Sequence, residues 1–263
     1  MSKMSNAPVF YAMAQVHFAP IAVANYSSLF HDAVRAKFPL KSSSVIRRLE
    51  LTHSGNMPSA QINDSTLWLL TAADQHSGLI LDDSTLTYHT TRYDTKMPFI
   101  DELVEALSHL HKIAKLDHLS RFGMRYLDAI FPKANRNLDE YLVGSVHGVS
   151  KPLLERRQAM SESIFRTQCS PLIEEGTLVS RVYQLHGKLE FPPELLPTSN
   201  LKLLKQFEEQ ETAHHAIIDT DHFVEGMIPM DLAGAKAQLE SLHQRCSDIF
   251  RAVTTEFAQE CWK

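Results

Sequence analysis

The hydrophobic and polar positions divide the chain into segments that alternate between strand spacing and helix spacing. Val9–Phe18 is rich in residues that favour strands and ends shortly before a proline, which predicts an opening strand. After Asn25, which we expect to cap a helix, apolar residues recur three or four positions apart until Pro39. Short β-like runs broken by turn residues follow, and they are typical of an antiparallel meander. The expected strands of this meander are Val45–Thr52, Pro58–Asn63, Thr66–Ala72, Gly78–Leu81 and Leu86–Thr91.

A helix pattern and a strand pattern come next. Pro98–Leu116 carries a single apolar stripe at helical spacing and has proline in its first turn. Leu119–Phe131 returns to strand character. Beyond it the pattern is looser, with a short helix expected at Asn137–Leu142 and a loop or helix at Lys151–Ala159. The remaining expected elements are strands at Ile164–Cys169, Leu178–Leu189 and His215–Phe223, and a proline-rich linker at Phe191–Pro197.

The longest expected helix closes the chain. Asp231 is its predicted cap, and the helix should run to about Trp262. Its apolar residues alternate three and four apart over about three heptads, which is the spacing of helix-on-helix packing. This seam packs either against the protein's own sheet or against a protein partner, of which a second copy of the chain is one. The seam consists of Leu232, Ala235, Leu239, Leu242, Cys246, Ile249, Val253 and Phe257.

Strands clustered in runs, with helices between them, indicate an α+β fold built on antiparallel sheets. Because a long helix closes each half, we expect two sub-domains. The N-terminal one covers residues 1–133 in the order β-α-β(meander)-α-β, and the C-terminal one covers residues 134–263 in the order α-β-β-β-α.

Composition supports an ordinary globular protein and narrows its setting. The chain has 263 residues, of which 44% are hydrophobic and 22% charged, close to the usual fractions for folded domains. A net charge of −5 argues against nucleic-acid binding by the whole surface, although a local patch stays open. Neither a signal-peptide core nor an apolar run long enough for a membrane span is visible. Three widely spaced cysteines fit a reducing compartment, so we expect a cytoplasmic protein with no membrane association.

Two charged clusters are the sharpest candidates for chemistry. Arg121 and Arg125 share one face of the expected strand with Gly123 between them, a pattern that could hold an anion such as phosphate. Asp219 and Asp221 likewise share a face and could hold a divalent cation, with His222 as an added ligand. A more economical hypothesis is that the two carboxylates are the partners of the two arginines, forming a charged network between the halves of the chain. No cofactor is predicted.

Basic doublets offer a weaker candidate site for nucleic acid. They lack the interleaved aromatic residues on which bases stack, so a solvated face is the favoured interpretation. The residues concerned are Arg47, Arg48, Lys151, Arg156 and Arg157.

These segments also carry a resemblance. His17-Phe18-Ala-Pro20, Trp68, Arg121-Phe-Gly-Met-Arg125-Tyr126-Leu-Asp-Ala-Ile130, Ile218-Asp-Thr-Asp-His-Phe223 and the region from Leu242 to Glu256 together resemble a sporadically distributed family of bacterial conserved hypothetical proteins of about 260 residues. That family typically reads R-x-G-L-R-Y-x-N-x-I in the central strand, whereas this chain has Met124 and Asp128 at the Leu and Asn positions. The resemblance implies a cytoplasmic protein without an assigned activity. Its patchy occurrence, often on mobile elements, suggests an accessory role in phage defence or a toxin–antitoxin system.

No sequence signature of a known catalytic class is present, neither a P-loop, G-x-S-x-G, G-x-G-x-x-G nor H-E-x-x-H motif. The function we expect is therefore non-enzymatic binding of a protein partner, including a homodimer formed through the helix Asp231–Trp262. The alternatives left open are a metal-dependent enzyme acting on phosphate-bearing substrates and a nucleic-acid binder.

Overall fold

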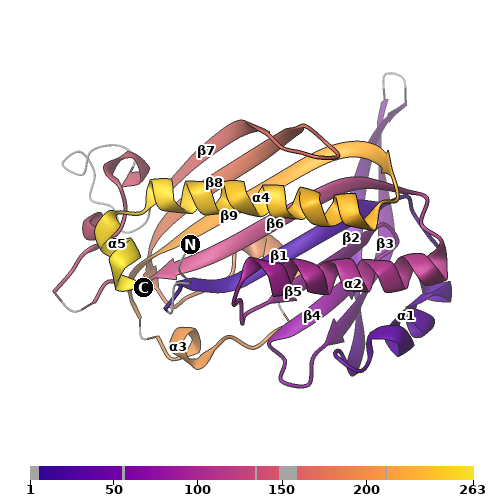
Figure 1. The fold of residues 1–263 in the computed structure, drawn as a ribbon, viewed down its shortest axis with the longest axis horizontal. Coiled ribbons are helices and arrows are strands. Elements are labelled where there is room, and N and C mark those ends of the chain that lie inside the picture. The colour runs from indigo at the N-terminus through magenta and orange to yellow at the C-terminus, as the bar shows by residue number, and fades with distance from the viewer. Residues whose placement is uncertain (1–5, 55–56, 134, 148–158, 199, 211) are drawn as a thin grey trace.

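Nine antiparallel strands form one continuous sheet in the described part of the chain, and two long helices lie side by side on one of its faces (Figure 1). The computed structural model describes all residues except 1–5, 55–56, 134, 148–158, 199 and 211, and of residues 47–63 it describes at most the backbone. The strand order is β2-β3-β4-β5-β1-β6-β9-β8-β7. The strands are β1 Val9–Phe18, β2 Leu40–Ser54, β3 Met57–Thr71, β4 Ser77–Leu81, β5 Thr85–Thr90, β6 His118–Ile130, β7 Ala159–Gln168, β8 Glu175–Gly187 and β9 Ala213–Pro229.

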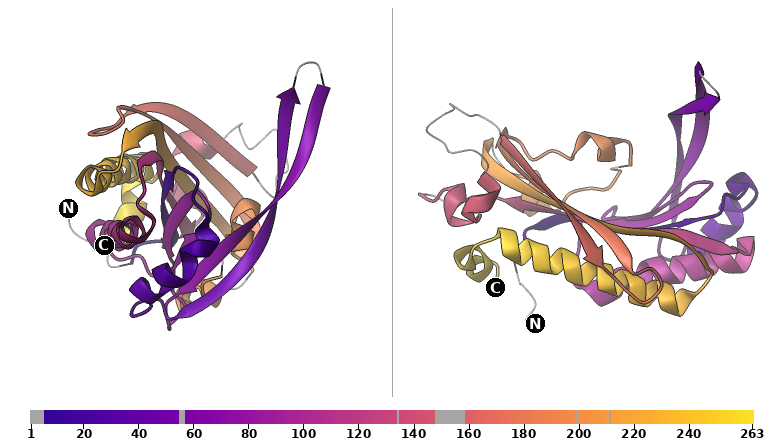
Figure 2. Two further views of the ribbon diagram at one scale, coloured as in Figure 1. Left: turned by 90° about the vertical axis from the view of Figure 1, so that its right-hand side faces the viewer. Right: turned by 90° about the horizontal axis from the view of Figure 1, so that it is seen from above.

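Helices cover both faces of this sheet unequally. The long helices α2 and α4 contact each other on one face, and the shorter α1 packs beside α2. A segment containing η5 and α3 crosses the opposite face, where the end of β2 and the start of β3 also project from the body of the protein (Figure 2). The helices are α1 Ser27–Val34, α2 Lys96–Ala114, α3 Lys205–Glu208, α4 Leu232–Val253 and α5 Glu256–Cys261, and the 3₁₀ turns are η1 Val23–Asn25, η2 Leu138–Glu140, η3 Gly144–His147 and η5 Pro193–Thr198.

The prediction of two sub-domains, each closed by its own long helix, is wrong. β6 pairs with β1 on one side and with β9 on the other, so the strands of the two halves belong to one sheet. Pairing along both edges satisfies the backbone N–H and C=O groups of β6, which two separate sheets would leave at an edge. The main core is shared as well, because Leu103 of α2 and Leu239 of α4 belong to the same buried cluster. The ranges 1–133 and 134–263 stay a prediction.

Some predictions of single strands and helices are confirmed within the one sheet, and others are wrong. The opening strand has the expected bounds, and the meander is antiparallel throughout. Two of its expected strands, Pro58–Asn63 and Thr66–Ala72, are parts of one longer strand, β3. The cap expected at Asn25 is wrong, since Asn25 lies in η1 and Tyr26 is the N-cap of α1. The predicted segment Lys151–Ala159 lies outside the described residues except for Ala159, which begins β7.

The closing helix is interrupted before the end expected from the sequence. Asp231 caps it as predicted, with its carboxylate accepting a hydrogen bond from Ala233 N at 3.0 Å. Thr254 then adopts an extended backbone, and the Thr255 hydroxyl accepts from Ala258 N to begin α5. Threonine side chains compete with helical backbone hydrogen bonds in this way. The apolar seam of α4 therefore ends at Val253.

This seam is buried against the protein's own sheet. Ala235, Leu239 and Leu242 have no exposed surface, and Cys246 is only 3% exposed. A homodimer through the predicted seam of Asp231–Trp262 would require these side chains to leave the core. A homodimer through the remaining residues of Asp231–Trp262 stays a prediction.

Shortening one seam residue should measure how strongly α4 is held. We expect Leu239→Ala to lower the free energy of unfolding by about 2–5 kcal/mol, because the substitution leaves a cavity in a fully buried position. Urea denaturation followed by circular dichroism measures this change. Gln244→Ala, at an exposed position of the same helix, should change it by less than about 0.5 kcal/mol. A loss as small for Leu239→Ala would contradict this packing of α4.

Candidate functional site

β6 and β9 present different chemistry on their two faces. Residues alternate between faces along a strand, so Arg121, Arg125, Asp219 and Asp221 all lie on the face away from α2 and α4. This arrangement follows from the register, in which Arg125 is opposite Asp221 and Leu127 is opposite Asp219. Two clusters far apart in the sequence thus become neighbours on adjacent strands.

Arg125 and Asp219 form a buried, bidentate ion pair. The Arg125 Nε and Nη2 atoms each donate to a different oxygen of Asp219 at 2.7 Å, and the side chain of Asp219 has no exposed surface. Nη2 of Arg125 also lies 2.5 Å from Glu194, which η5 carries over this face. Burial alone would lower the pKa of Arg125, but the hydrogen bonds and charges of Asp219 and Glu194 outweigh it and raise the pKa. Arg125 is therefore permanently charged, and the carboxylates of Asp219 and Glu194 balance its charge.

Arg121 has a different set of partners. Its Nε lies 3.4 Å from Glu225, its Nη1 donates to Gln15 at 3.2 Å, and its guanidinium stacks on the Phe223 ring at 4.4 Å. The same side chain lies across Gly123, because a Cβ built there would be 3.5 Å from Arg121 Nη1. The space that an anion would need above the glycine is thus occupied by the arginine itself.

Asp221 lies on the same face of β9 as Asp219 but forms no ion pair with an arginine among the described residues. Burial raises its pKa, and the nearby charges of Arg125 and Arg121 oppose that rise. It lines a small hollow of about 150 Å³ together with Arg121, Arg125 and Leu195. Across the part of the chain that the structure describes, no hydrogen bond or ion pair of its carboxylate is found. Of the two predicted arginine partners, only Asp219 forms an ion pair.

His222 lies on the opposite face of β9 from these aspartates. Its Nδ1 is 3.1 Å from the carbonyl oxygen of Leu242, and its Nε2 is 2.8 Å from the Thr167 hydroxyl. The strand therefore separates His222 from the two carboxylates with which it was expected to bind a cation. The described residues contain no cluster of three or more His, Cys, Asp or Glu side chains that could hold a metal ion.

The side chains of the basic doublets fall outside the described part of the chain. Lys151, Arg156 and Arg157 lie outside the described residues, and Arg47 and Arg48 belong to the part of β2 of which only the backbone is described.

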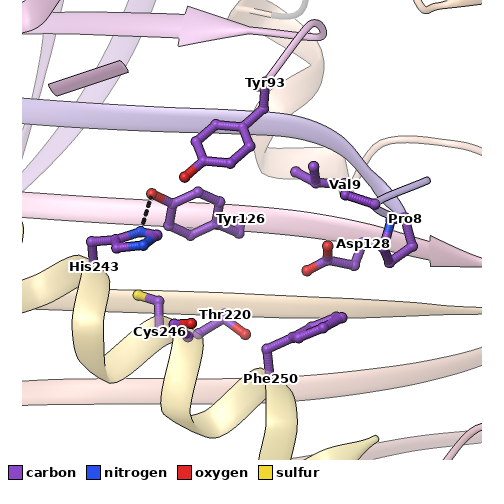
Figure 3. Close-up of a pocket in the computed structure, with 11 residues that line it drawn as sticks. Pro8, Val9, Tyr93, Tyr126, Asp128, Thr220, His243, Cys246 and Phe250 are labelled. Carbon is purple, nitrogen blue, oxygen red and sulfur yellow. Dashed lines mark hydrogen bonds between the residues drawn. The ribbon is translucent and has the colours of Figure 1, made fainter. Parts of the chain in front are cut away.

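A cavity of about 110 Å³ lies on the other face of β6 and β9, beneath α4 (Figure 3). Aromatic and apolar side chains line most of it, and a few polar groups converge on it. Its lining residues come from the start of β1, the loop before α2, and the elements β6, β9 and α4. They are Ala7, Pro8, Val9, Tyr93, Tyr126, Asp128, Thr220, His243, Cys246, Ser247 and Phe250.

Two polar groups in this cavity are buried without a visible partner. Asp128 is 6% exposed, and no ion pair or hydrogen bond of its carboxyl is found within the described ranges. Desolvation by burial raises its pKa to about 8. The hydroxyl of Thr220, which is 1% exposed, also lacks a hydrogen-bond partner among the described residues. Buried polar groups in folded proteins are nearly always hydrogen-bonded, so each of these needs an explanation.

On the opposite wall of the cavity, Tyr126 and His243 are hydrogen-bonded to each other and uncharged. The Tyr126 hydroxyl lies 3.0 Å from Nδ1 of His243. Burial lowers the pKa of His243 to about 4, and the charges of Lys96 and Arg251 act in the same direction. Because His243 is neutral at pH 7, the tyrosine hydroxyl can donate to its unprotonated nitrogen. Burial raises the pKa of Tyr126 and of the Cys246 thiol well above their usual values.

Sequence reasoning did not identify this cavity. Tyr126 and Asp128 appeared only as members of a strand motif, and Thr220 only as the residue between two aspartates. The available signal was the alternation itself, which places Tyr126, Asp128 and Thr220 on the helix-covered face together with polar atoms that an ordinary core lacks.

An apolar cavity with a few convergent polar groups and a perturbed pKa is the usual form of a small-ligand site. A scan against models of known protein families and a search of curated proteins found no match to this chain. No helix in the described ranges is both long and apolar enough to cross a lipid bilayer.

Proposed function

We propose that this chain acts by binding protein rather than by catalysis, that the binding element is the free edge of β7, and that the partner which fits this edge is a second copy of the chain. β7 is the last strand of the sheet and pairs only with β8 among the described strands. Its outer edge therefore offers backbone donors and acceptors to an added strand. Three apolar side chains stand exposed along it, with Met160 at 57%, Ile164 at 63% and Phe165 at 42%.

The residues of β7 complement themselves in one antiparallel register. In a sheet joined from two copies, the helices of both copies lie on the same side only if each β7 residue faces one an even number of positions away in the sequence. With Ile164 on the two-fold axis, Glu162 faces Arg166 of the second copy, and the same pair occurs again on the other side of the axis. The small Ser163 then faces the large Phe165. Moving the centre to Ser163 or Phe165 would instead place Ile164 opposite a charged side chain.

The neighbourhood of this edge supports strand addition. A groove of about 420 Å³ between β7 and α4 is lined partly by apolar side chains, including Phe165, Leu178 and Ile249. An added strand would cover part of this surface. The observation that carries the proposal is the outer edge of β7, with which none of the described strands pairs, because natural proteins usually cover or charge such edges.

A lysine at the proposed axis should separate the two copies. We expect Ile164→Lys to raise the dimer dissociation constant at least about tenfold, since two ammonium groups would meet at the axis. Sedimentation velocity over a concentration series measures the change. Val45→Lys is the matched control, because Val45 lies on the other edge strand, β2, and is exposed to a similar degree, 62%. A parent protein that stays monomeric, or an equal effect of both lysine variants, would overturn the proposal.

Charge reversal tests the register. Arg166→Glu should weaken the dimer by placing two carboxylates opposite each other, and the double variant Glu162→Arg with Arg166→Glu should restore it. Because Glu162 also lies 2.6 Å from Arg181 within the chain, circular dichroism must show that each variant is folded. Failure of the double variant to recover dimerisation would reject this register.

A further inference from the structure

We propose that the cavity beneath α4 binds a small organic ammonium cation, with the Asp128 carboxylate as its counter-ion. This site is separate from the proposed β7 interface. It lies on β6, β9 and the buried side of α4, whereas β7 is at the edge of the sheet.

The first step of the inference concerns the unpaired acid. An isolated carboxylate is costly to bury and normally has a cation or several hydrogen-bond donors beside it. None of the lining residues is Lys or Arg, and the neighbouring His243 is neutral at pH 7. A bound cation would supply the charge that the described protein atoms do not. Figure 3 shows the Asp128 carboxyl directed into the space between Tyr126 and Phe250.

The second step concerns the walls. The rings of Tyr93, Tyr126 and Phe250 line the same cavity, and the faces of aromatic rings attract organic cations. The unpartnered Thr220 hydroxyl adds an oxygen that can accept a hydrogen bond from an N–H group. One carboxylate, one hydroxyl and several rings together match an ammonium group that carries a short apolar substituent.

The third step sets the size of the ligand. A cavity of about 150 Å³ in a protein core accommodates benzene, so this partly open cavity of about 110 Å³ holds fewer than about six heavy atoms between its walls. Methylammonium is therefore a suitable probe. Methanol is its matched neutral counterpart, because it has the same number of heavy atoms and retains a hydrogen-bonding group.

Protonation adds a signature that packing alone would not produce. Burial raises the pKa of Asp128 to about 8, so the cation must displace a proton at neutral pH. The groups facing Asp128 from the surrounding elements are Tyr93, Tyr126, His243 and Cys246. All four are neutral between pH 6 and pH 8, because the pKa values of both tyrosines and of the Cys246 thiol are raised and that of His243 is lowered to about 4. Affinity should therefore rise about tenfold from pH 6 to pH 7 and level off above about pH 8.

The experiment is an NMR titration of the full chain with methylammonium chloride at constant ionic strength. Above about pH 8, where Asp128 is ionised without displacement of a proton, we expect saturable shifts at the cavity residues with millimolar affinity, the range that a ligand with two heavy atoms can reach. Asp128→Asn should weaken binding at least tenfold, and methanol should show no saturation. Phe250→Leu, which removes one ring and keeps the acid, should weaken binding severalfold.

Three results would overturn the ammonium site: equal binding of methanol, unchanged binding by Asp128→Asn, or an affinity that does not depend on pH between 6 and 8. Ile164→Lys should bind methylammonium like the parent protein. Loss of the β7 dimer and loss of the ammonium site are therefore separate outcomes.

Discussion

At pH 7.5, the Asp128→Asn variant is expected to be more stable than the parent protein by about 3 kcal/mol. The pKa of Asp128 is raised by burial from 3.8 to about 8, so the folded protein binds a proton that the unfolded chain has already released. Each unit between the two values corresponds to about 1.4 kcal/mol. We expect less than the full difference because the cavity is partly open to solvent. Asparagine has the shape of the protonated acid and carries no such cost.

The sign of the pH dependence follows from the same difference. Below about pH 4 both states are protonated and Asp128 costs nothing, whereas between about pH 4 and pH 8 only the folded state holds the proton. The free energy of unfolding of the parent protein should therefore fall over this range relative to that of the asparagine variant. Urea unfolding at a series of pH values measures both curves. Thr220→Val removes a neighbouring hydroxyl but no titratable group, so its curve should run parallel to that of the parent. Parallel curves for parent and Asp128→Asn would contradict a shifted pKa.

The second large effect is expected on the opposite face of the same strands. Asp219→Ala should lower the free energy of unfolding by about 3–5 kcal/mol, because it removes one partner of a buried ion pair and leaves the charge of Arg125 poorly compensated. Glu194 would keep its ion pair with Arg125, but its side chain is 54% exposed. Asp221 would also stay near Arg125, without an ion pair among the described residues.

Glu225→Ala is the matched control for Asp219→Ala. Glu225 also lies on β9 and also pairs with an arginine of β6, but its side chain is 66% exposed. Exposed pairs of this kind contribute at most about 1 kcal/mol. Chemical denaturation of the two variants under identical conditions gives the comparison. Equal losses of the free energy of unfolding would mean that the ion pair of Arg125 and Asp219 stabilises the fold no more than an exposed ion pair does.

Local elements could be predicted well because their signals are local. The opening strand and the antiparallel meander follow from strand alternation and turn residues. One apolar stripe predicts a helix at Pro98–Leu116, which the structure has at Lys96–Ala114. The shared face of Asp219 and Asp221 follows from the two-residue period of a strand. Such patterns carry no information about which strands from distant parts of the chain become neighbours.

The merging of the two halves depends on pairing between distant segments. β1 lies between β5 and β6, and β9 pairs with β6 across about ninety residues of sequence. The partner of Arg125 depends on the same register, since the residue directly opposite is Asp221 but the ion pair forms diagonally with Asp219. A one-residue change of register would exchange the faces of all these side chains.

The cavity was beyond sequence reasoning for a related reason. Its walls come from β1, the loop at Tyr93, β6, β9 and α4, and no spacing in the sequence links them. In the sequence, Asp128 differs from the resembled motif only as an aspartate in place of asparagine, and a single aspartate in a strand is ordinary. Only its burial without a visible partner makes it a candidate for ligand binding.

The proposed ammonium site depends on the protonation state of Asp128. NMR titration of the Asp128 carboxyl carbon, assigned by comparison with Asp128→Asn, measures it directly. We expect a midpoint near pH 8 in the free protein and a lower midpoint when methylammonium is added, because a bound cation favours the ionised acid. A midpoint near pH 4, unchanged by methylammonium, would show that Asp128 is an ordinary solvated acid and would contradict the proposed site.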